Sequence, residues 1–278
     1  MVGREDMEKM VRFWIFVYCM ALLAVFLGCT APKCREVKPL EELERDNIEN
    51  IDDLLDNVDA SEDQRRRIFA LVRKLTPRLG TLRKRLDSKT HALLDELRKP
   101  VPRSERILGL VVEVFDVLAA FTHNTIPILL EGYKIFTPEQ LAKWIEENLE
   151  KKEPFEGSWL LDRCIDIFLL RIHASSAQRN LTIELKDEIV RQSVPLQKEL
   201  AQIRRTNVKE FLKANPNPEV VHASVDRAKE SLVSFISNVV DYYLSWNANL
   251  EPDQQQVVHK YLRRLEPCEA SKPETQNL

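Results

Sequence analysis

The side chains that could hold a metal ion in this chain are scattered along it. The five cysteines show no C-x-x-C spacing, and all four methionines precede residue 28, so no set of thiolate or thioether ligands is evident. No two histidines are four residues apart and none has a cysteine at ligand spacing; they are His91, His123, His173, His222 and His259. The sequence therefore predicts no metal site and no cofactor.

Catalytic motifs give no support for an enzyme. The chain contains no G-x-S-x-G, H-E-x-x-H or phosphate-binding glycine loop, and only four glycines follow residue 28. Carboxylates are so common on its predicted helices that choosing a catalytic pair would be arbitrary. A net charge of −3 excludes a generally nucleic-acid-binding chain. We expect a non-enzymatic protein that binds no nucleic acid.

Cys29 lies at the end of an apolar run that starts at Phe13, follows three basic residues and ends in Phe26-Leu27-Gly28. That order is typical of an export signal, and the run is shorter than a membrane-spanning helix prefers. The cysteine resembles that of the bacterial lipobox, which is acylated and becomes the new N-terminus. We predict a signal peptide over 1–28 and a lipid anchor at Cys29 that holds the body on the periplasmic face of the outer membrane. An uncleaved N-terminal anchor is the alternative.

Two further cysteines, Cys164 and Cys268, remain in the body of the chain. An oxidising compartment would allow a disulfide between them. Free or buried thiols are the alternative, because spacing alone establishes no geometry.

The body of the chain is an internal duplication with an offset of 114 residues. Asn50-Ile51-Asp52 corresponds to Cys164-Ile165-Asp166, and the pentapeptide at 60–64 corresponds to that at 174–178. A second pentapeptide at 136–140 corresponds to 250–254, and in both halves the two pentapeptide glutamines are 76 residues apart. The proline pair at 100 and 102 matches that at 216 and 218 after a two-residue shift. We expect two homologous units, over 46–152 and 158–267, between a tether at 29–45 and a disordered tail at 268–278.

Each pentapeptide carries the pattern of a helix start. A Ser or Thr followed three residues later by Gln forms a capping box, and proline is tolerated at the first helical position. The fourth copy has Glu251 at the cap and should start its helix less firmly. The predicted capping residues are Ser61, Gln64, Thr137, Pro138, Gln140, Ser175, Gln178, Pro252 and Gln254.

Apolar residues recur at helical spacing between these starts, so an all-α fold follows. Long helices are expected at 62–98, 104–133, 176–213 and 220–246, with short ones at 48–57 and 159–172 and after each of the two proline starts. Pro77 and Pro195 should kink two of the long helices.

The four pentapeptides resemble the paired LTxxQ motifs of the Spy/CpxP family of periplasmic proteins; Phe136-Thr137-Pro138-Glu139-Gln140 is the nearest copy. The resemblance covers about residues 46–267. It implies two tandem four-helix, bent-cradle units that form a pseudo-dimer within one chain, so no obligate homodimer is expected. It also implies chaperone activity towards unfolding proteins, inhibition of envelope-stress sensor kinases or metal-responsive sensing. The scattered histidines and the lack of methionine after residue 28 disfavour the last of these.

Charge distinguishes the two parts of the first unit. Residues 61–106 carry fourteen Lys/Arg against six Asp/Glu, whereas 35–60 carry three against ten. The basic segment suits steering of acidic client proteins, with Arg66, Arg73 and Lys84 as candidate contacts. The alternative is a solvated helix face paired with the acidic segment before it.

The function expected from these features is binding. Our first hypothesis is an ATP-independent holdase for unfolded or stress-exposed envelope proteins. The alternative is a regulatory or structural lipoprotein that docks on a sensor kinase or another folded periplasmic partner.

Overall fold

A computed structural model describes residues 40–149, 158–213 and 215–263, and within these ranges it is all-α, with no β-strand. The first half contains α2 (Leu40–Asn57), α3 (Glu62–Leu97), α4 (Ser104–Tyr133) and α5 (Pro138–Leu149). The second half contains α6 (Ser158–Arg171), α7 (Ser176–Phe211), α8 (Pro218–Ala248) and α9 (Pro252–Arg263). Long and short helices thus follow the same order in both halves.

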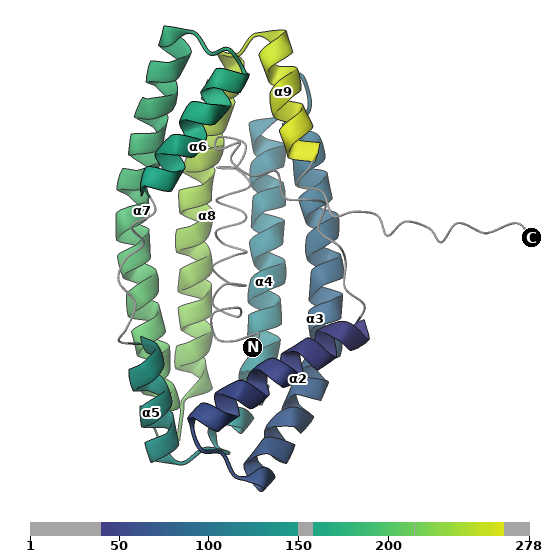
Figure 1. Cartoon of the computed structure of the whole chain (residues 1–278), viewed down its shortest axis with the longest axis vertical. Coiled ribbons are helices and arrows are strands. Elements are labelled where there is room, and N and C mark those ends of the chain that lie inside the picture. The colour runs from purple at the N-terminus through teal and green to yellow at the C-terminus, as the bar shows by residue number, and fades with distance from the viewer. Residues whose placement is uncertain (1–39, 150–157, 214, 264–278) are drawn as a thin grey trace, which may run out of the picture.

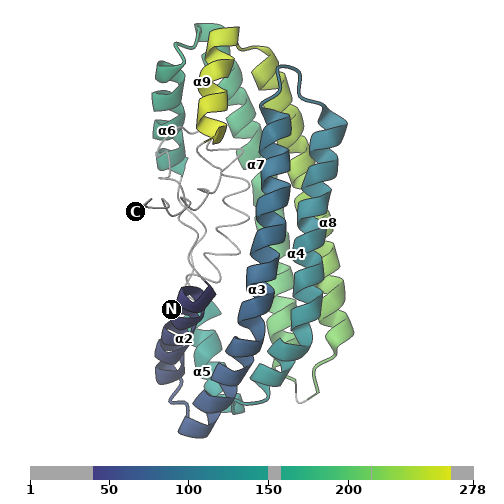
Figure 2. The ribbon, with the colours of Figure 1, turned by 90° about the vertical axis from the view of Figure 1, so that its right-hand side faces the viewer.

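The four long helices form one layer in the order α3, α4, α8, α7 (Figure 1). The short helices lie on one side of this layer, with α2 and α5 across one end and α6 and α9 across the other (Figure 2). Helices α4 and α8 pack against each other at the centre, so the two halves meet there, and α3 and α7 form the outer edges. This arrangement leaves each outer helix with one long edge that faces no other long helix.

Most predicted helix boundaries agree with the structure to within two residues, because capping and proline signals act locally. The range 104–133 is that of α4, and Pro138 and Pro252 are the first residues of α5 and α9. The start of the first short helix was wrong. It was expected at residue 48, but α2 begins at Leu40, within the segment predicted to be a tether.

The internal prolines do not end their helices. Helix α3 continues through Pro77, α4 through Pro127 and α7 through Pro195. Figure 2 shows the first turns of α3 tilted towards α2 relative to the rest of the helix. Proline removes one backbone hydrogen bond and its ring crowds the preceding turn, which bends a helix held by tertiary packing without breaking it.

One hydrophobic core extends through both halves. It contains Leu86 and Val114 from the first half together with Phe168, Val240 and Trp246 from the second. Two smaller clusters lie apart from it, one around Leu55 of α2 and one around Leu71 between α3 and α4. Since the largest core takes residues from both sequence units, the units share the apolar burial that stabilises them.

Helix α4 is, among the residues described, the one helix long and apolar enough to cross a membrane by length and composition. Its apolar residues Ile107, Leu110, Val111 and Val114 are buried in the shared core. A core helix passes the same test of length and composition, so this property adds no membrane segment to the fold.

The connector between the long helices is built alike in each half. Buried Glu96, near the end of α3, accepts the backbone N–H of Arg103, the N-cap of α4, at 3.2 Å. Buried Glu210 accepts the backbone N–H of Asn217, the N-cap of α8, at 2.7 Å. These pairs keep the offset of 114, so the two-residue shift inferred from the prolines was wrong. Pro102 corresponds to Pro216, and Pro218 takes the position of Ser104.

Candidate functional site

The pentapeptides at 60–64 and 174–178 both begin with Ala-Ser. In each, the Ala ends one helix and the Ser starts the next. After α2, Ala60 N–H donates to the carbonyl of Leu55 at 3.0 Å and Asp59 N–H to that of Asp56 at 3.1 Å. Together with the φ of 52° at Asp59, these bonds form a Schellman motif. Buried Ala60 and Leu55 belong to one apolar cluster, and Ser61 then caps α3. A small apolar residue before the Ser can therefore be buried at the end of one helix while the Ser caps the next.

The same turn recurs at the end of α6. Ala174 N–H donates to the carbonyl of Leu169 and His173 N–H to that of Leu170, at 2.9 and 3.1 Å. His173 also has a φ of 52°. An offset of 114 therefore relates backbone geometry as well as sequence.

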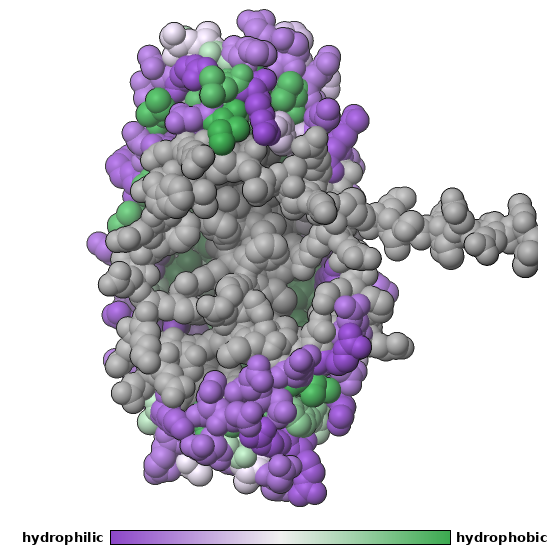
Figure 3. Space-filling model, in the orientation of Figure 1, coloured by the Kyte–Doolittle hydropathy of each residue, from purple (hydrophilic) through white to green (hydrophobic). Residues whose placement is uncertain are grey.

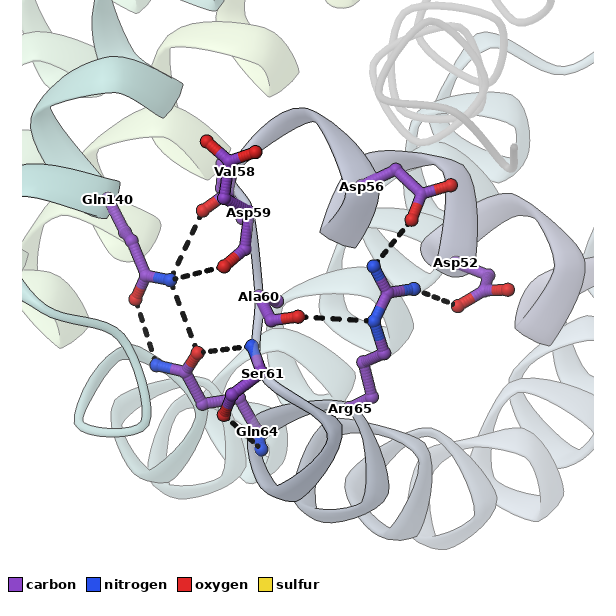
Figure 4. A network of polar contacts seen from close by, with 9 residues as sticks. All are labelled: Asp52, Asp56, Val58, Asp59, Ala60, Ser61, Gln64, Arg65 and Gln140. Atoms are coloured by element: carbon purple, nitrogen blue, oxygen red, sulfur yellow. Dashed lines mark hydrogen bonds and ion pairs between the residues drawn. The ribbon is translucent and has the colours of Figure 1, made fainter.

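The glutamines of the two pentapeptides in the first half contact each other. Gln64 Nε2 donates to Gln140 Oε1 at 2.8 Å, and Gln140 Nε2 donates back to Gln64 Oε1 at 3.2 Å (Figure 4). Each Oε1 also accepts the backbone N–H of its own cap, Ser61 or Thr137, at 2.9 Å. Each Nε2 donates a second bond, from Gln64 to the Ile135 carbonyl and from Gln140 to the Val58 carbonyl. We call this pair the glutamine clamp.

A second glutamine clamp joins Gln178 and Gln254, with side-chain bonds of 2.8 and 3.1 Å. Gln178 also donates to the Asn249 carbonyl and Gln254 to the Ile172 carbonyl. The capping boxes predicted at Ser61, Thr137 and Ser175 are present, with both reciprocal bonds. In the fourth copy Gln254 Oε1 accepts the N–H of Glu251 at 2.8 Å, so the glutamine half of the box is retained.

The acidic segment before α3 pairs with that basic helix. Arg65 contacts Asp52 at 2.6 Å and Asp56 at 2.5 Å, and its Nε donates to the Ala60 carbonyl (Figure 4). Arg73 lies 3.6 Å from Glu44 of α2. Part of the charge contrast read from the sequence is therefore internal pairing between α2 and α3, which is the alternative interpretation given above.

The candidate client contacts Arg66, Arg73 and Lys84 are exposed and spaced seven and eleven residues apart, so they lie along one face of α3. At 100° per residue this face is opposite Leu71 and Leu86, which are buried against the rest of the layer. We call these three residues the basic edge. Arg66 lies 3.3 Å from Asp63, an exposed pair of small energetic weight.

The equivalents of the basic edge in α7 are Asn180, Asp187 and Lys198, so the basic edge belongs to the first half alone. Helix α7 instead carries a row of exposed apolar residues at other positions, which the sequence analysis did not single out. Ile183, Val190 and Val194 follow Arg179 at helical spacing, and the Nε of Arg179 donates to the Ala174 carbonyl after α6. This face of α7 therefore points to the side of the layer that carries the short helices.

The three side chains are 40–46% exposed, and Leu170 on α6 is 61% exposed. We call Leu170, Ile183, Val190 and Val194 the α7 stripe. Thr76, the equivalent of Val190 in the first half, is buried. Figure 3 shows hydrophobic side chains gathered over the end that carries α6 and α9, whereas the α2 end is mainly hydrophilic. Exposed apolar rows of this kind are typical of interaction surfaces.

The predicted lipid anchor, disulfide and terminal segments involve residues outside the described ranges. Cys29, the signal peptide, most of the tether and the tail are outside the described residues. Cys164 is in α6, but its predicted disulfide partner Cys268 is also outside them. These assignments stay predictions.

Sequence reasoning missed one polar cluster. His123 of α4 lies within hydrogen-bond distance of His222 and Asp226 of α8. The two histidines are 99 residues apart, so no local spacing rule finds them. The sole sequence signal was the four-residue interval from His222 to Asp226.

Comparison with protein-family models, with curated proteins and with solved structures finds no match to this chain. The resemblance to the Spy/CpxP family therefore rests on the pentapeptides, and membership stays a prediction.

Proposed function

We propose that this protein is an ATP-independent, chaperone-like binding protein that holds unfolded or stress-exposed proteins on the α7 stripe. The observation that carries the proposal is the row of exposed Ile183, Val190 and Val194 on one face of a helix. Three residues of α7 are buried, namely Thr182, Ile189 and Glu210, and three leucines pack against the core while partly buried, namely Leu185, Leu196 and Leu200. An elongated row of exposed apolar side chains suits loose, sequence-tolerant contact with apolar segments.

The basic edge gives the same proposal an electrostatic component. Its three cations lie at the opposite edge of the layer from the α7 stripe (Figure 1). Because the basic edge is far from the α7 stripe, we expect it to steer acidic clients during encounter rather than to hold them. Because the cations are exposed, salt should weaken this component, which acts over a Debye length of about 8–10 Å.

The lipid anchor and the export route remain part of the proposal. An acylated Cys29 would place the binding surfaces at the periplasmic face of the outer membrane. Labelling of the cell-expressed protein with a radioactive fatty acid, lost in Cys29→Ser, would support this arrangement. Equal labelling of the variant would contradict it.

The holdase proposal is tested by light scattering of two unrelated chemically unfolded proteins, with and without the full chain. We expect suppression of both at near-stoichiometric amounts. Val190→Ser/Val194→Ser should lose most of it, since both changes remove exposed methyl groups from the α7 stripe. The matched control is Val101→Ser/Val112→Ser, which makes the same chemical change at exposed valines elsewhere. Such surface changes alter stability by roughly 0.5 kcal/mol or less.

Two results would contradict the proposal. One is no suppression of either client, which would favour the alternative of docking on a single folded partner. The other is equal suppression by the stripe variant and its control. Steering is tested separately with Arg66→Gln/Arg73→Gln/Lys84→Gln, which should flatten the salt dependence. Lys198→Gln/Arg205→Gln/Lys209→Gln makes the same charge change on α7 and should not.

A further inference from the structure

The imidazole rings of His123 and His222 meet where the two halves of the molecule pack together. Their Nδ1 atoms are 2.6 Å apart, while the ring centroids are 4.8 Å apart and the ring planes differ by 24°. The centroid separation exceeds the nitrogen separation by about two ring radii. The rings therefore meet edge to edge, with the two Nδ1 atoms directed at each other.

Asp226 determines which ring nitrogen of His123 carries the proton and which presents a lone pair. Its Oδ1 lies 2.9 Å from His123 Nε2, on the side of the ring away from His222. A carboxylate accepts a hydrogen bond and cannot donate one, so Nε2 carries a proton and Nδ1 of neutral His123 presents its lone pair to His222. Metal-binding histidines are oriented by carboxylates in this way.

Two ring nitrogens this close need either a hydrogen bond or a metal ion between them. A neutral His222 with its proton on Nδ1 can donate to His123 Nδ1, and a metal ion with affinity for imidazole can take the place of that hydrogen. We propose that His123 and His222 form a two-nitrogen site for a divalent transition-metal ion of the Zn²⁺ class, with Asp226 as the outer carboxylate. The proposal goes beyond the holdase function and does not rest on it.

The site needs a modest opening to take the ion. Bonds of about 2.0–2.1 Å from each nitrogen to a tetrahedral ion place the nitrogens about 3.3 Å apart. His123 has a side chain 28% exposed, so its ring has room to rotate and water can fill the remaining coordination positions. The described residues contain no group of three or more His, Cys, Asp or Glu side chains placed to share one ion. The affinity should therefore be that of a two-ligand site.

The charges nearby are compatible with a cation. Asp226 contributes a negative charge one turn after His222, and Asp116 of α4 contributes another. Lys229 of α8 is paired with Asp116, and that contact raises the pKa of its ammonium group. The charge of Lys229 is thus largely balanced by a carboxylate on the facing helix. Arg78 of α3 donates to the backbone carbonyl of Asn124, the residue after His123.

Metal binding here would join the halves, because His123 lies in α4 and His222 in α8. An ion bound only to the folded arrangement stabilises it by mass action. The ion displaces the hydrogen from Nδ1 of His222, and neutral His222 then carries its proton on Nε2, so the exchange needs no net release of a proton.

The test is calorimetric titration of the full chain with Zn²⁺, with Mg²⁺ as the negative probe. We expect one Zn²⁺ per chain and a Zn²⁺-dependent rise in unfolding temperature. His123→Ala and His222→Ala should each weaken binding at least tenfold and remove the thermal shift. His91→Ala, a histidine substitution in α3, is the matched control and should change neither.

Asp226→Asn keeps both rings and tests the role of the carboxylate if either alanine variant fails to fold. It should weaken Zn²⁺ binding about ten- to a hundredfold, as loss of an outer-shell partner does elsewhere. The proposal is overturned if the wild-type chain binds no Zn²⁺ at 100 µM or below, which would leave an N–H···N hydrogen bond as the account of the pair. It is equally overturned if the His123→Ala and His222→Ala chains bind Zn²⁺ as the His91→Ala control does.

Discussion

At the scale of single residues, the pentapeptide glutamines do more than cap helices. In the first glutamine clamp, Gln64 Oε1 accepts from Ser61 and Gln140 while its Nε2 donates to Gln140 and the Ile135 carbonyl. A capping box alone could use Glu as well as Gln. Only an amide supplies the two donors that the facing oxygens require.

This requirement makes Gln64→Glu destabilising although Glu is a favourable capping residue. The substitution keeps the bond to Ser61 but leaves the Ile135 carbonyl without its donor and removes one bond to Gln140. We expect the free energy of unfolding to fall by about 1–3 kcal/mol, the range for leaving a buried polar group unsatisfied. Urea unfolding followed by circular dichroism measures it.

The matched control is Gln202→Glu, which makes the same change at an exposed position of α7. It should leave the free energy of unfolding nearly unchanged. A loss for Gln64→Glu no larger than for this control would mean that the clamp is not energetically significant.

At the scale of helices and their connections, Glu96 links α3 to α4. It is buried, and hydrogen bonds from the Arg103 side chain, followed by Lys99, lower its pKa to about 2. Lys213 and the backbone of Asn217 likewise lower the pKa of its counterpart Glu210. Glu96 thus accepts the N-cap amide of α4, which has no side-chain cap, and Glu210 accepts that of α8, where the Asn217 side chain also caps the helix.

The lowered pKa of Glu96 predicts acid sensitivity with a defined sign. The folded pKa is below that of the unfolded chain, near 4.5, so acid protonates the unfolded state first. Stability from this group is present above about pH 4.5 and is lost as the pH falls towards 2. We expect Glu96→Gln to be less stable at pH 7 and to lose less stability between pH 5 and pH 2.5.

Urea unfolding at several pH values measures this difference between Glu96→Gln and the wild type. Glu184→Gln, at an exposed position of α7, is the control and should keep the wild-type acid profile. A Glu96→Gln profile parallel to that of the wild type would show that the carboxylate contributes nothing to acid sensitivity.

At the scale of the whole molecule, the shared core couples the two sequence units. Tyr243 of α8 lies fully buried, with its hydroxyl donating to the Leu97 carbonyl at the end of α3, and burial raises the pKa of that hydroxyl. Tyr133 of α4 stacks on Phe211 of α7 with ring centroids 4.4 Å apart. Separation of the halves would expose these contacts and the facing surfaces of α4 and α8.

The full chain should therefore unfold in one cooperative transition despite its internal duplication. Scanning calorimetry should give a calorimetric enthalpy equal to the van't Hoff enthalpy. Residues 158–267 expressed alone serve as the control and should lack cooperative unfolding, because their apolar α8 face would be exposed. Two separate transitions for the full chain, or a cooperative transition for the isolated half, would contradict this prediction.

The sequence by itself determined the helices and their repetition. Periodicity, the capping pairs and the prolines act over a few residues, so α3, α4, α6, α7 and α8 could be placed from local pattern to within two residues, and α5 and α9 at their starts. The start of α2 at Leu40 was missed because no capping pair of Ser or Thr with Gln marks it, although Pro39 directly precedes it in the sequence. The offset of 114 was visible from matching residues in the two halves. The structure shows that the connectors between the long helices keep the same offset.

Only the tertiary structure decided which faces meet and which stay exposed. The glutamine clamps join residues 76 positions apart and the histidine pair residues 99 positions apart, beyond the reach of any local rule. Both units carry similar periodic helices, but α2 lies across α3 and pairs with its basic residues, while Val190 and Val194 of α7 stay exposed. Exposure depends on what packs opposite a side chain, which is a property of the assembled layer.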